Sequence, residues 1–277
     1  MTRRIVLVMD CDGTLAQDTT TLLVKQVLGD VGGFWDDVRK MVMEGWDPPL
    51  AWTTKLLGDA NRRAIQIDES LLRATADKIQ FFDGALDLEK RLRTFAQQQA
   101  NGSGIEVELS IHVITSGYED LLRLSALKGA VTEIWGSLLN FGSDAGIAIG
   151  PKAAVSFTEK TKFVFAINKG ILKKELRQWP ERVNDLVPRI SRPVPFENMI
   201  YVGDGLTDIP CYSLIQQHGG AAVGIRNDVR SQGADEPLLW NYRPRWGPFR
   251  PDFREESDLT KLLKDLIHDV VVRSRNA

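Results

Sequence analysis

Carboxylates follow two apolar runs in positions where they could act together on one substrate. Asp10 and Asp12 come directly after residues 5–9, and Asp204 and Asp208 come after a later apolar run. Side chains two positions apart in extended backbone point the same way, so the first two carboxylates can face one site. A carboxylate can serve as nucleophile, as general acid or base, and as a hard oxygen ligand for Mg²⁺. Chemistry at a phosphorus atom needs these functions together.

A third apolar run is followed by hydroxyl groups and a glycine. Thr115, Ser116 and Gly117 come directly after residues 111–114. If the three apolar runs are neighbouring parallel strands, their carboxyl ends meet in one crevice, where open α/β sheets bind ligands. We therefore expect these hydroxyls to lie beside the carboxylates, where they could bind a phosphoryl group.

A basic cluster lies between the second and third of these segments. It contains Lys160, Lys162 and Lys169. With Lys160 at the site, the residues three, four and seven positions later are apolar and can pack on a sheet as one helix face. With Lys162 at the site, the residue seven positions later is Lys169. The spacing favours Lys160 as the group that neutralises the phosphoryl charge, with Lys162 as the alternative.

The elements that must position these side chains follow from hydrophobic periodicity. Strands are expected at residues 4–9, 111–114, 132–135, 199–202 and 221–225, and a β-hairpin at 140–149. Helices are expected at residues 84–99, 118–127, 160–167 and 259–272. Residues 177–198 contain four prolines, which favours a loop or an embellishment near the site. The segment 235–256, rich in Arg, Pro and Trp, receives no role.

The stretch between the first two motifs has a different pattern. Residues 19–78 show helical spacing, broken by glycine and proline, and no convincing strand. The sequence thus predicts an α/β fold, a doubly wound, Rossmann-like parallel sheet core with a small inserted helical cap domain. The core is predicted to comprise residues 1–18 and 83–277, and the cap residues 19–82.

Composition narrows the class of protein. A net charge of -2, with 43% hydrophobic and 26% charged residues among 277, is typical of a soluble globular protein without affinity for nucleic acid. Two cysteines, Cys11 and Cys211, cannot form a disulfide scaffold, which favours the reducing cytoplasm. The first apolar run is too short for a signal peptide or a membrane span. The histidines receive no role, and the oligomeric state is left open.

In their joint order, these motifs resemble those of the haloacid dehalogenase (HAD) superfamily, and most closely its phosphatases similar to phosphoserine phosphatase. The resemblance rests on Asp10-Cys11-Asp12-Gly13-Thr14-Leu15, on Thr115, on a lysine that starts a helix, and on Gly203-Asp204-Gly205-Leu206-Thr207-Asp208. It runs from residue 3 to about 226. Any one of these stretches alone is most often a capped or solvated turn.

The resemblance implies a role for each carboxylate. Asp10 would be the nucleophile, would form an aspartyl-phosphate and would bind Mg²⁺. Asp12 would be the general acid and then the general base, and its backbone carbonyl would also bind the metal. Asp204 would be a metal ligand, and Asp208 would be a ligand or would support the ligands.

The resemblance also assigns the substrate-binding groups. The Thr115 hydroxyl, with backbone N–H groups near Ser116 and Gly117, would hold the phosphoryl oxygens, and Lys160 would neutralise them. The implied activity is Mg²⁺-dependent hydrolysis of a small phosphorylated metabolite, with no membrane or nucleic-acid partner.

Two positions make phosphoserine a poor candidate for the substrate. Related phosphatases that use it carry a Glu where this chain has Thr19, and an Arg in the cap region where this chain offers Lys55. Four alternatives remain: a phosphotransferase, a dehalogenase, a phosphorylated signalling module of the receiver type, and a binding protein without turnover. A dehalogenase would carry the nucleophilic Asp without an acid two residues later, so Asp12 disfavours it. A receiver module needs far fewer residues and lacks the late Gly-Asp-Gly-x-x-Asp motif, so both features disfavour it.

Overall fold

The computed structural model describes residues 2–142, 146–226 and 244–275, with the side chain of residue 275 left aside. Its centre is one sheet with the strand order β4-β3-β2-β1-β5-β6-β7. The strands are β1 (Thr2–Met9), β2 (Glu106–Tyr118), β3 (Glu133–Phe141), β4 (Ala148–Ala153), β5 (Met199–Gly203), β6 (Ala221–Ile225) and β7 (Trp246–Phe249). Neighbouring strands are parallel except β3 and β4, which are antiparallel.

The central strand β1 is buried on both faces, as a continuous aliphatic run requires. Ile5, Leu7 and Met9 belong to the apolar core on one face of the sheet, and Val6 and Val8 to the core on the other. Helices cover both faces, so the predicted doubly wound α/β class is confirmed.

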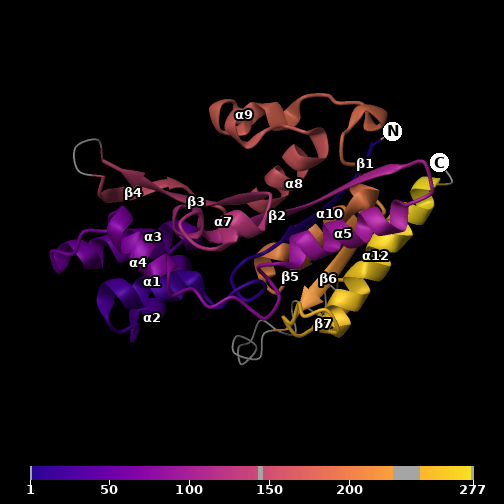
Figure 1. Cartoon of the computed structure of the whole chain (residues 1–277). Helices are drawn as coiled ribbons and strands as arrows, with labels where there is room; N and C mark the ends of the chain where they lie inside the picture. Colours follow the sequence, from indigo (N-terminus) through magenta and orange to yellow (C-terminus); the bar gives the residue numbers. More distant parts are fainter. Residues whose placement is uncertain (1, 143–145, 227–243, 276–277) are drawn as a thin grey trace.

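Helices pack on both faces of the sheet (Figure 1). On the face of Ile5 lie α5 (Leu88–Ala100) and α12 (Asp258–Arg275), which contribute Leu92 and Leu263 to the core. On the face of Val6 lie α8 (Glu159–Lys169) and α10 (Ile209–Gln217). The remaining short helical segments are α6 (Glu119–Leu122), α7 (Leu127–Ala130), α9 (Lys173–Gln178), η1 (Pro180–Asn184), η2 (Arg189–Ser191), η3 (Phe196–Asn198) and η4 (Leu206–Asp208).

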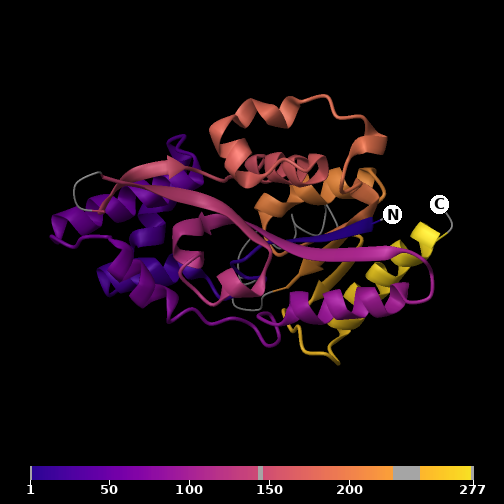
Figure 2. The same cartoon turned by 45° about the horizontal axis from the view of Figure 1, so that its top comes forward.

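The stretch between β1 and α5 is helical and gathers at one end of the molecule, beside β3 and β4 (Figures 1 and 2). It contains α1 (Thr19–Leu28), α2 (Phe34–Met43), α3 (Pro48–Arg62) and α4 (Glu69–Ala76). These helices share an apolar core that also includes Leu139 of β3 and Ala148 of β4. The backbone N–H of Ala148 donates to the Ile67 carbonyl at 2.8 Å. The strand pair β3–β4 therefore packs into the helical cap.

The second predicted strand differs from expectation at its carboxyl end. Strand β2 continues to Tyr118, where it pairs with Ser137 of β3, whereas the sequence suggested an end at residue 114. Pairing shifts between Ile114 and Tyr118, so residues 115–117 form a bulge in the strand rather than a turn after it. The apolar run ends at residue 114, and the polar residues and glycine that follow it occur both in bulges and in turns, so the sequence does not distinguish the two.

The helix predicted over residues 118–127 is wrong as a single element. It is replaced by α6 and α7, each of four residues. Ser125 interrupts the helix, because its hydroxyl donates to the Leu122 carbonyl at 2.8 Å and accepts from the Leu127 N–H at 3.2 Å. Such local side-chain bonds compete with the helical hydrogen bonds.

The other predicted elements are found, with shifted ends. The helices expected at 84–99, 160–167 and 259–272 correspond to α5, α8 and α12. The hairpin expected at 140–149 corresponds to β3 and β4, although its tip, with Asp144, lies outside the described residues. Strand β7 was not predicted, and much of the unassigned segment 235–256 also lies outside the described residues.

The proline-rich segment 177–198 contains only the end of α9 and three short 3₁₀ turns. It lies at the carboxyl end of α8, whereas Lys160 is at the amino end of that helix. Lys169, in the last turn of α8, donates to the carbonyls of Val183 and Asp185. Nine residues of helix separate the two lysines by about 14 Å. The contact with Lys169 therefore anchors this segment away from the predicted site.

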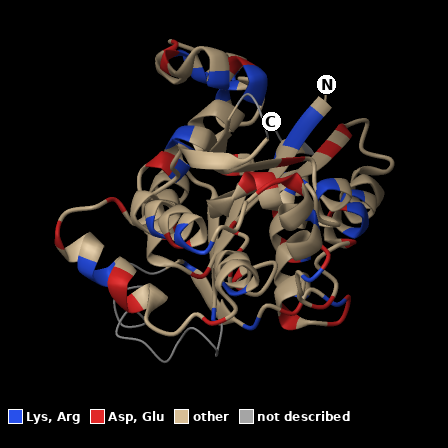
Figure 3. Cartoon of the chain, turned by 90° about the vertical axis from the view of Figure 1, so that its left-hand side faces the viewer, with Lys and Arg blue, Asp and Glu red and all other residues tan. Residues whose placement is uncertain are grey.

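Surface charge is mixed. Lys and Arg alternate with Asp and Glu along the elements, and neither sign covers the side seen in Figure 3. This distribution agrees with the net charge of -2. Among the described helices, none has the length and apolar character needed to cross a membrane.

Candidate active site

The strand register brings the three predicted motifs to one edge of the sheet. Met9 pairs with Val113 of β2 on one side and with Val202 of β5 on the other. Asp10 is the next residue, and its N–H donates to the Val202 carbonyl at 2.9 Å. The residues after Val113 and Val202 leave the same edge, since parallel strands share their carboxyl ends. Motifs more than 100 positions apart in the chain are therefore neighbours.

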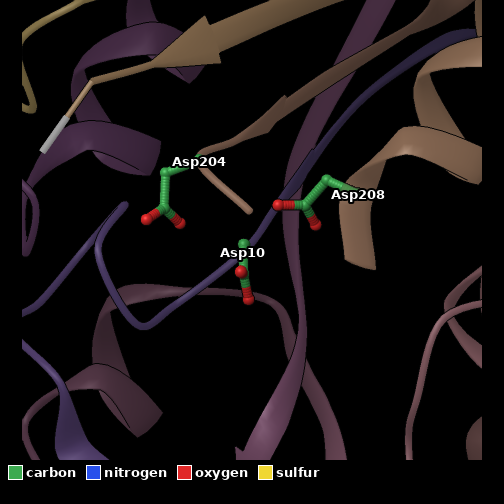
Figure 4. A group of neighbouring side chains, drawn as sticks. All are labelled: Asp10, Asp204 and Asp208. Atoms are coloured by element: carbon green, nitrogen blue, oxygen red, sulfur yellow. The ribbon is translucent and has the colours of Figure 1, made fainter. Parts of the chain in front are cut away.

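Three of the predicted carboxylates converge at this edge (Figure 4). Asp10, Asp204 and Asp208 each offer an oxygen, and these oxygens lie within 4.8 Å of one another. Asp10 is 5% exposed and Asp208 is fully buried, so water cannot screen the cluster well. Three neighbouring carboxylates, two of them buried and one partly buried, fit Mg²⁺, which prefers hard oxygen ligands and would offset their mutual repulsion.

Lys160 lies between two of these carboxylates and is completely buried. Its Nζ is 3.1 Å from Asp10 Oδ1 and 2.7 Å from Asp208 Oδ1. It lies in the first turn of α8. Val164 and Ile167 of the same helix pack in the apolar core against the sheet and so fix the position of the lysine. Lys162 lies elsewhere and pairs with Glu159. The structure therefore brings the first of the two candidate lysines to the site.

Burial and charge shift the pKa values of this pair. Burial raises the pKa of Asp10 well above its usual range, opposed by Lys160 and reinforced by Asp208, Asp204 and Asp12. Burial alone would lower the pKa of Lys160, but the Asp10 and Asp208 carboxylates outweigh it and hold that pKa above the usual range. Lys160 is thus a permanent cation, and further positive charge at the site would favour ionised Asp10.

The carboxylate of Asp208 is held by hydrogen bonds from α8, from β5 and from the turn at Gly205. Its Oδ1 accepts from Lys160 and, at 2.7 Å, from the Tyr201 hydroxyl of β5, and its Oδ2 accepts from the Gly205 N–H at 2.9 Å. A Cβ on Gly203 would lie 2.4 Å from Asp208 Oδ2, so only glycine fits there. Asp208 precedes α10 but makes no side-chain cap to it, so its carboxylate serves the site rather than the helix.

Asp204 is positioned by the turn after β1. The Thr14 hydroxyl donates to Asp204 Oδ1 at 3.2 Å. Gly13 has φ +87°, and a Cβ there would lie 2.0 Å from Asp204 Oδ2. Glycine is needed both for the backbone conformation and for the close approach of the carboxylate.

The side chain of Asp12 lies outside the three-carboxylate cluster. Its Oδ1 accepts from the N–H of Thr19 at 2.9 Å and from the Thr19 hydroxyl at 2.6 Å. Its Oδ2 accepts from the Thr20 hydroxyl at 3.3 Å. Both threonines belong to the first turn of α1. The second carboxylate of the first motif is therefore separated from the metal candidates and bound by the cap.

The predicted phosphoryl-binding residues lie beside Asp12. A Cβ on Gly117 would be 2.9 Å from Asp12 Oδ2 and 3.3 Å from Thr115 Oγ1, so all three residues share one small space. The buried Thr115 hydroxyl accepts from the Gly117 N–H at 3.0 Å. Within the described part of the chain, the buried Ser116 hydroxyl has no hydrogen-bond partner. The bulge thus places the Thr115 hydroxyl beside Asp12.

Sequence reasoning missed Tyr201 and the contacts of Thr19 and Thr20 with Asp12. Tyr201 was read as part of an apolar strand, Thr19 was noted only as replacing a substrate-reading Glu, and Thr20 received no role. A polar residue inside a fully buried strand is the signal that could have identified the tyrosine. Both cysteines are buried and neither forms a disulfide within the described residues, and burial raises the pKa of Cys211 to about 12, so its thiol stays neutral.

No family model matches the chain. A protein of Borreliella burgdorferi, described as uncharacterized, is 25% identical over 162 residues, which cover 54% of this chain and 53% of that protein. The chain thus spans about half the length of this curated relative.

Solved structures are similar over most of the chain. A HAD family hydrolase from Salmonella enterica has a TM-score of 0.51 at 16% identity, covering 82% of this chain and 64% of its own. Phosphoserine phosphatase in apo form has a TM-score of 0.54 at 14% identity, covering 91% and 97%. A phospho-aspartyl intermediate analogue of phosphoserine phosphatase has a TM-score of 0.50 at 15% identity, covering 95% and 99%. The chain therefore has the fold of the HAD hydrolases, as its motifs indicate, and phosphoserine phosphatase shares that fold.

Proposed function

We propose that this protein is a Mg²⁺-dependent phosphatase that hydrolyses a small phosphomonoester through an aspartyl-phosphate on Asp10. The observation that carries the proposal is the fully buried Lys160 between Asp10 and Asp208, next to a third carboxylate. Two buried carboxylates and a third, partly buried one beside a single lysine leave excess negative charge, which is costly unless further positive charge completes the site. The similarity to a phosphatase trapped as a phospho-aspartyl analogue supports the same chemistry.

The first half of the reaction transfers the phosphoryl group to the protein. A carboxylate oxygen of Asp10 attacks phosphorus, the bond from phosphorus to the ester oxygen breaks, and the leaving oxygen takes a proton from Asp12. Lys160 and the Thr115 hydroxyl hold the phosphoryl oxygens. Mg²⁺, bound by Asp10, Asp204 and Asp208 with the Asp12 carbonyl, would neutralise negative charge on those oxygens.

The second half restores the protein. Water attacks the phosphorus of the aspartyl-phosphate and gives its proton to the Asp12 carboxylate, and the bond from Asp10 to phosphorus breaks. Inorganic phosphate leaves, and Asp12 is again protonated for the next cycle. One water is consumed for each ester hydrolysed, and no other reactant is needed.

The cap favours a small metabolite other than phosphoserine as the substrate. A cap over the site excludes bulk water and limits the size of the ligand. Thr19, where a Glu reads the amino group in the resembled phosphatases, bonds to Asp12 instead. Lys55 lies 3.1 Å from Asp37 and 3.3 Å from Asp59, so its charge is already paired within the cap. We further propose that residues 19–82 form this cap domain and that the protein works in the cytoplasm.

A phosphate-substrate screen with and without Mg²⁺ tests the proposed function. Wild-type protein is expected to hydrolyse p-nitrophenyl phosphate and several metabolite phosphates only when Mg²⁺ is present. Asp10→Asn removes the nucleophile and is expected to lower turnover at least about 10³-fold while leaving the circular dichroism spectrum unchanged.

Two results would contradict the proposal. Undiminished hydrolysis by Asp10→Asn would exclude the aspartyl-phosphate route. A wild-type protein without activity on any phosphate in the screen would favour a binding role, and chloride release from haloacids would favour the dehalogenase.

A further inference from the structure

The carboxylate of Asp12 is bound by the first turn of α1 through three hydrogen bonds. Two come from Thr19 and one from Thr20, and their lengths are 2.9, 2.6 and 3.3 Å. Asp12, Thr19 and Thr20 are 7%, 1% and 5% exposed. Both carboxylate oxygens therefore have fixed donors in a place that water hardly reaches. Hydrogen bonds to a charged group are stronger than neutral ones, so this contact sets the orientation of the side chain.

The turn that donates these bonds is itself held in place. The Asp18 side chain accepts from the Thr21 N–H at 2.8 Å and so caps α1. Leu23 and Val27 anchor the same helix in the apolar core of the cap. Gly117 of the β2 bulge also borders the carboxylate: a Cβ there would lie 2.9 Å from Asp12 Oδ2 and 3.2 Å from Thr20 Oγ1, so glycine leaves room for this contact. Asp12 is thus fixed between the bulge of β2 and the cap, and its orientation depends on where α1 lies.

We infer that Thr19, assisted by Thr20, is a positioning residue that aims the Asp12 carboxyl at the leaving oxygen and so couples the cap to proton transfer. The inference rests on the proposed function, because it concerns how the proton reaches the departing alcohol. In that step Asp12 loses a proton to the ester oxygen as the bond to phosphorus breaks. Thr19 gains a stronger hydrogen bond to the resulting carboxylate and is not consumed.

A pair of aryl phosphates separates positioning from a structural role. p-Nitrophenolate is a weak base and departs without a proton, whereas phenolate is more basic and its departure depends on the proton from Asp12. The two esters are nearly the same size, so binding affects them alike. The parameter kcat/KM reports the steps from binding of the ester to departure of the phenol. It does not include the later hydrolysis of the aspartyl-phosphate.

Thr19→Val removes the hydroxyl and keeps the shape. With this variant, kcat/KM for phenyl phosphate is expected to fall about 10-fold and that for p-nitrophenyl phosphate less than about 2-fold, the effect of one hydrogen bond to a charged group. Thr19→Ser restores the hydroxyl and is expected to recover most of the loss. If Thr19→Val does not fold, Thr20→Val tests the weaker contact. It is expected to lower kcat/KM for phenyl phosphate more than that for p-nitrophenyl phosphate, by a smaller factor than Thr19→Val.

Thr21→Val is the matched control, since Thr21 lies in the same turn and bonds to the Asp18 side chain through its backbone N–H, which valine keeps. It is expected to behave as wild type with both esters. Equal losses on both esters, no rescue by serine, or an equal effect of Thr21→Val would overturn the inference. Those results differ from failure of the proposed function, in which wild-type protein would not hydrolyse p-nitrophenyl phosphate at all.

Discussion

At the scale of single residues, the account depends on what surrounds Lys160. A buried ammonium group between Asp10 and Asp208 neutralises charge that would otherwise repel an incoming phosphoryl group. Its position is fixed by the first turn of α8, so it needs no rearrangement to act. A preorganised cation of this kind can contribute a large share of the rate enhancement.

Lys160→Met should remove this charge. Turnover of p-nitrophenyl phosphate is expected to fall about 10²-fold or more, because the charge on the phosphoryl oxygens loses its fixed cation. Lys162→Met is the matched control: Lys162 pairs with the partly exposed Glu159 away from the site, and its loss should leave turnover within about 2-fold of wild type. Steady-state kinetics of both variants distinguish the two lysines. Equal losses in both would contradict the role given to Lys160, and Lys160→Gln, which also removes the charge, serves if the methionine variant does not fold.

At the scale of elements, one buried glutamate joins a helix to two strands. Glu89 of α5 is 6% exposed and accepts from the N–H groups of Ile111 and Thr132 at 2.9 and 2.7 Å. Its other oxygen accepts from the Thr132 hydroxyl at 2.9 Å. The residue satisfies backbone groups near the start of β3 and along β2, so it fixes how α5 lies on the sheet.

Glu89→Ala should therefore lower the free energy of unfolding. The loss is expected to be about 2–4 kcal/mol, because two backbone donors and a hydroxyl would lose their acceptor. Urea denaturation followed by circular dichroism measures it. Lys90→Ala, at the exposed neighbouring position, should change stability by less than about 0.5 kcal/mol. If both variants unfold at the same urea concentration, the glutamate does not join these elements.

The same scale shows where sequence reasoning succeeds and where it stops. Aliphatic runs such as residues 5–9 identify the central strands, which are buried on both faces. They also locate the motif residues, because these follow the carboxyl ends of the strands. Tyr118 continues a strand past a bulge, which local periodicity cannot distinguish from a turn. Strand β7 is only four residues long, and Gly247 and Pro248 at its centre are both rare in strands. It therefore lacks a strand pattern in the sequence and forms through its pairing with β6.

The site was predictable to a similar extent. The carboxylates, Thr115 and the choice between two lysines follow from motif order and helix spacing. The bonds from Thr19 and Thr20 to Asp12 depend on how the cap begins, which is a tertiary contact and leaves no pattern in the sequence. Tyr201 likewise reaches Asp208 only because β5 and α10 bring them together.

At the scale of the whole molecule, a half-buried histidine links stability to pH. His112 of β2 pairs with Glu133 in the register, and its buried Nδ1 has no hydrogen-bond partner in the described part of the chain. Burial lowers the pKa of His112 to about 4, with Glu133 raising it and Lys173 lowering it to smaller extents. The unfolded chain would protonate this group near its ordinary pKa of 6.5.

Because the unfolded state binds the proton first, stability from neutral His112 is present above pH 6.5 and is lost as the pH falls toward 4. Between pH 7 and pH 5 this loss is expected to be about 1–2 kcal/mol in wild type. His112→Asn should show a smaller loss over the same interval. Exposed His268, which bonds to Gln99, gives the control: His268→Asn should keep the wild-type dependence, measured by urea unfolding at both pH values. An unchanged pH dependence in His112→Asn would exclude this histidine as the cause.

The most direct test of the account is to trap the covalent intermediate. Protein mixed with Mg²⁺ and p-nitrophenyl phosphate, quenched in acid during turnover, is digested and sequenced by mass spectrometry. The account predicts the added mass of one phosphoryl group on the peptide that contains Asp10, localised to that residue and missing from Asp10→Asn. A phosphoryl group on another residue, or steady hydrolysis by wild type with none trapped under conditions that slow its breakdown, would contradict it.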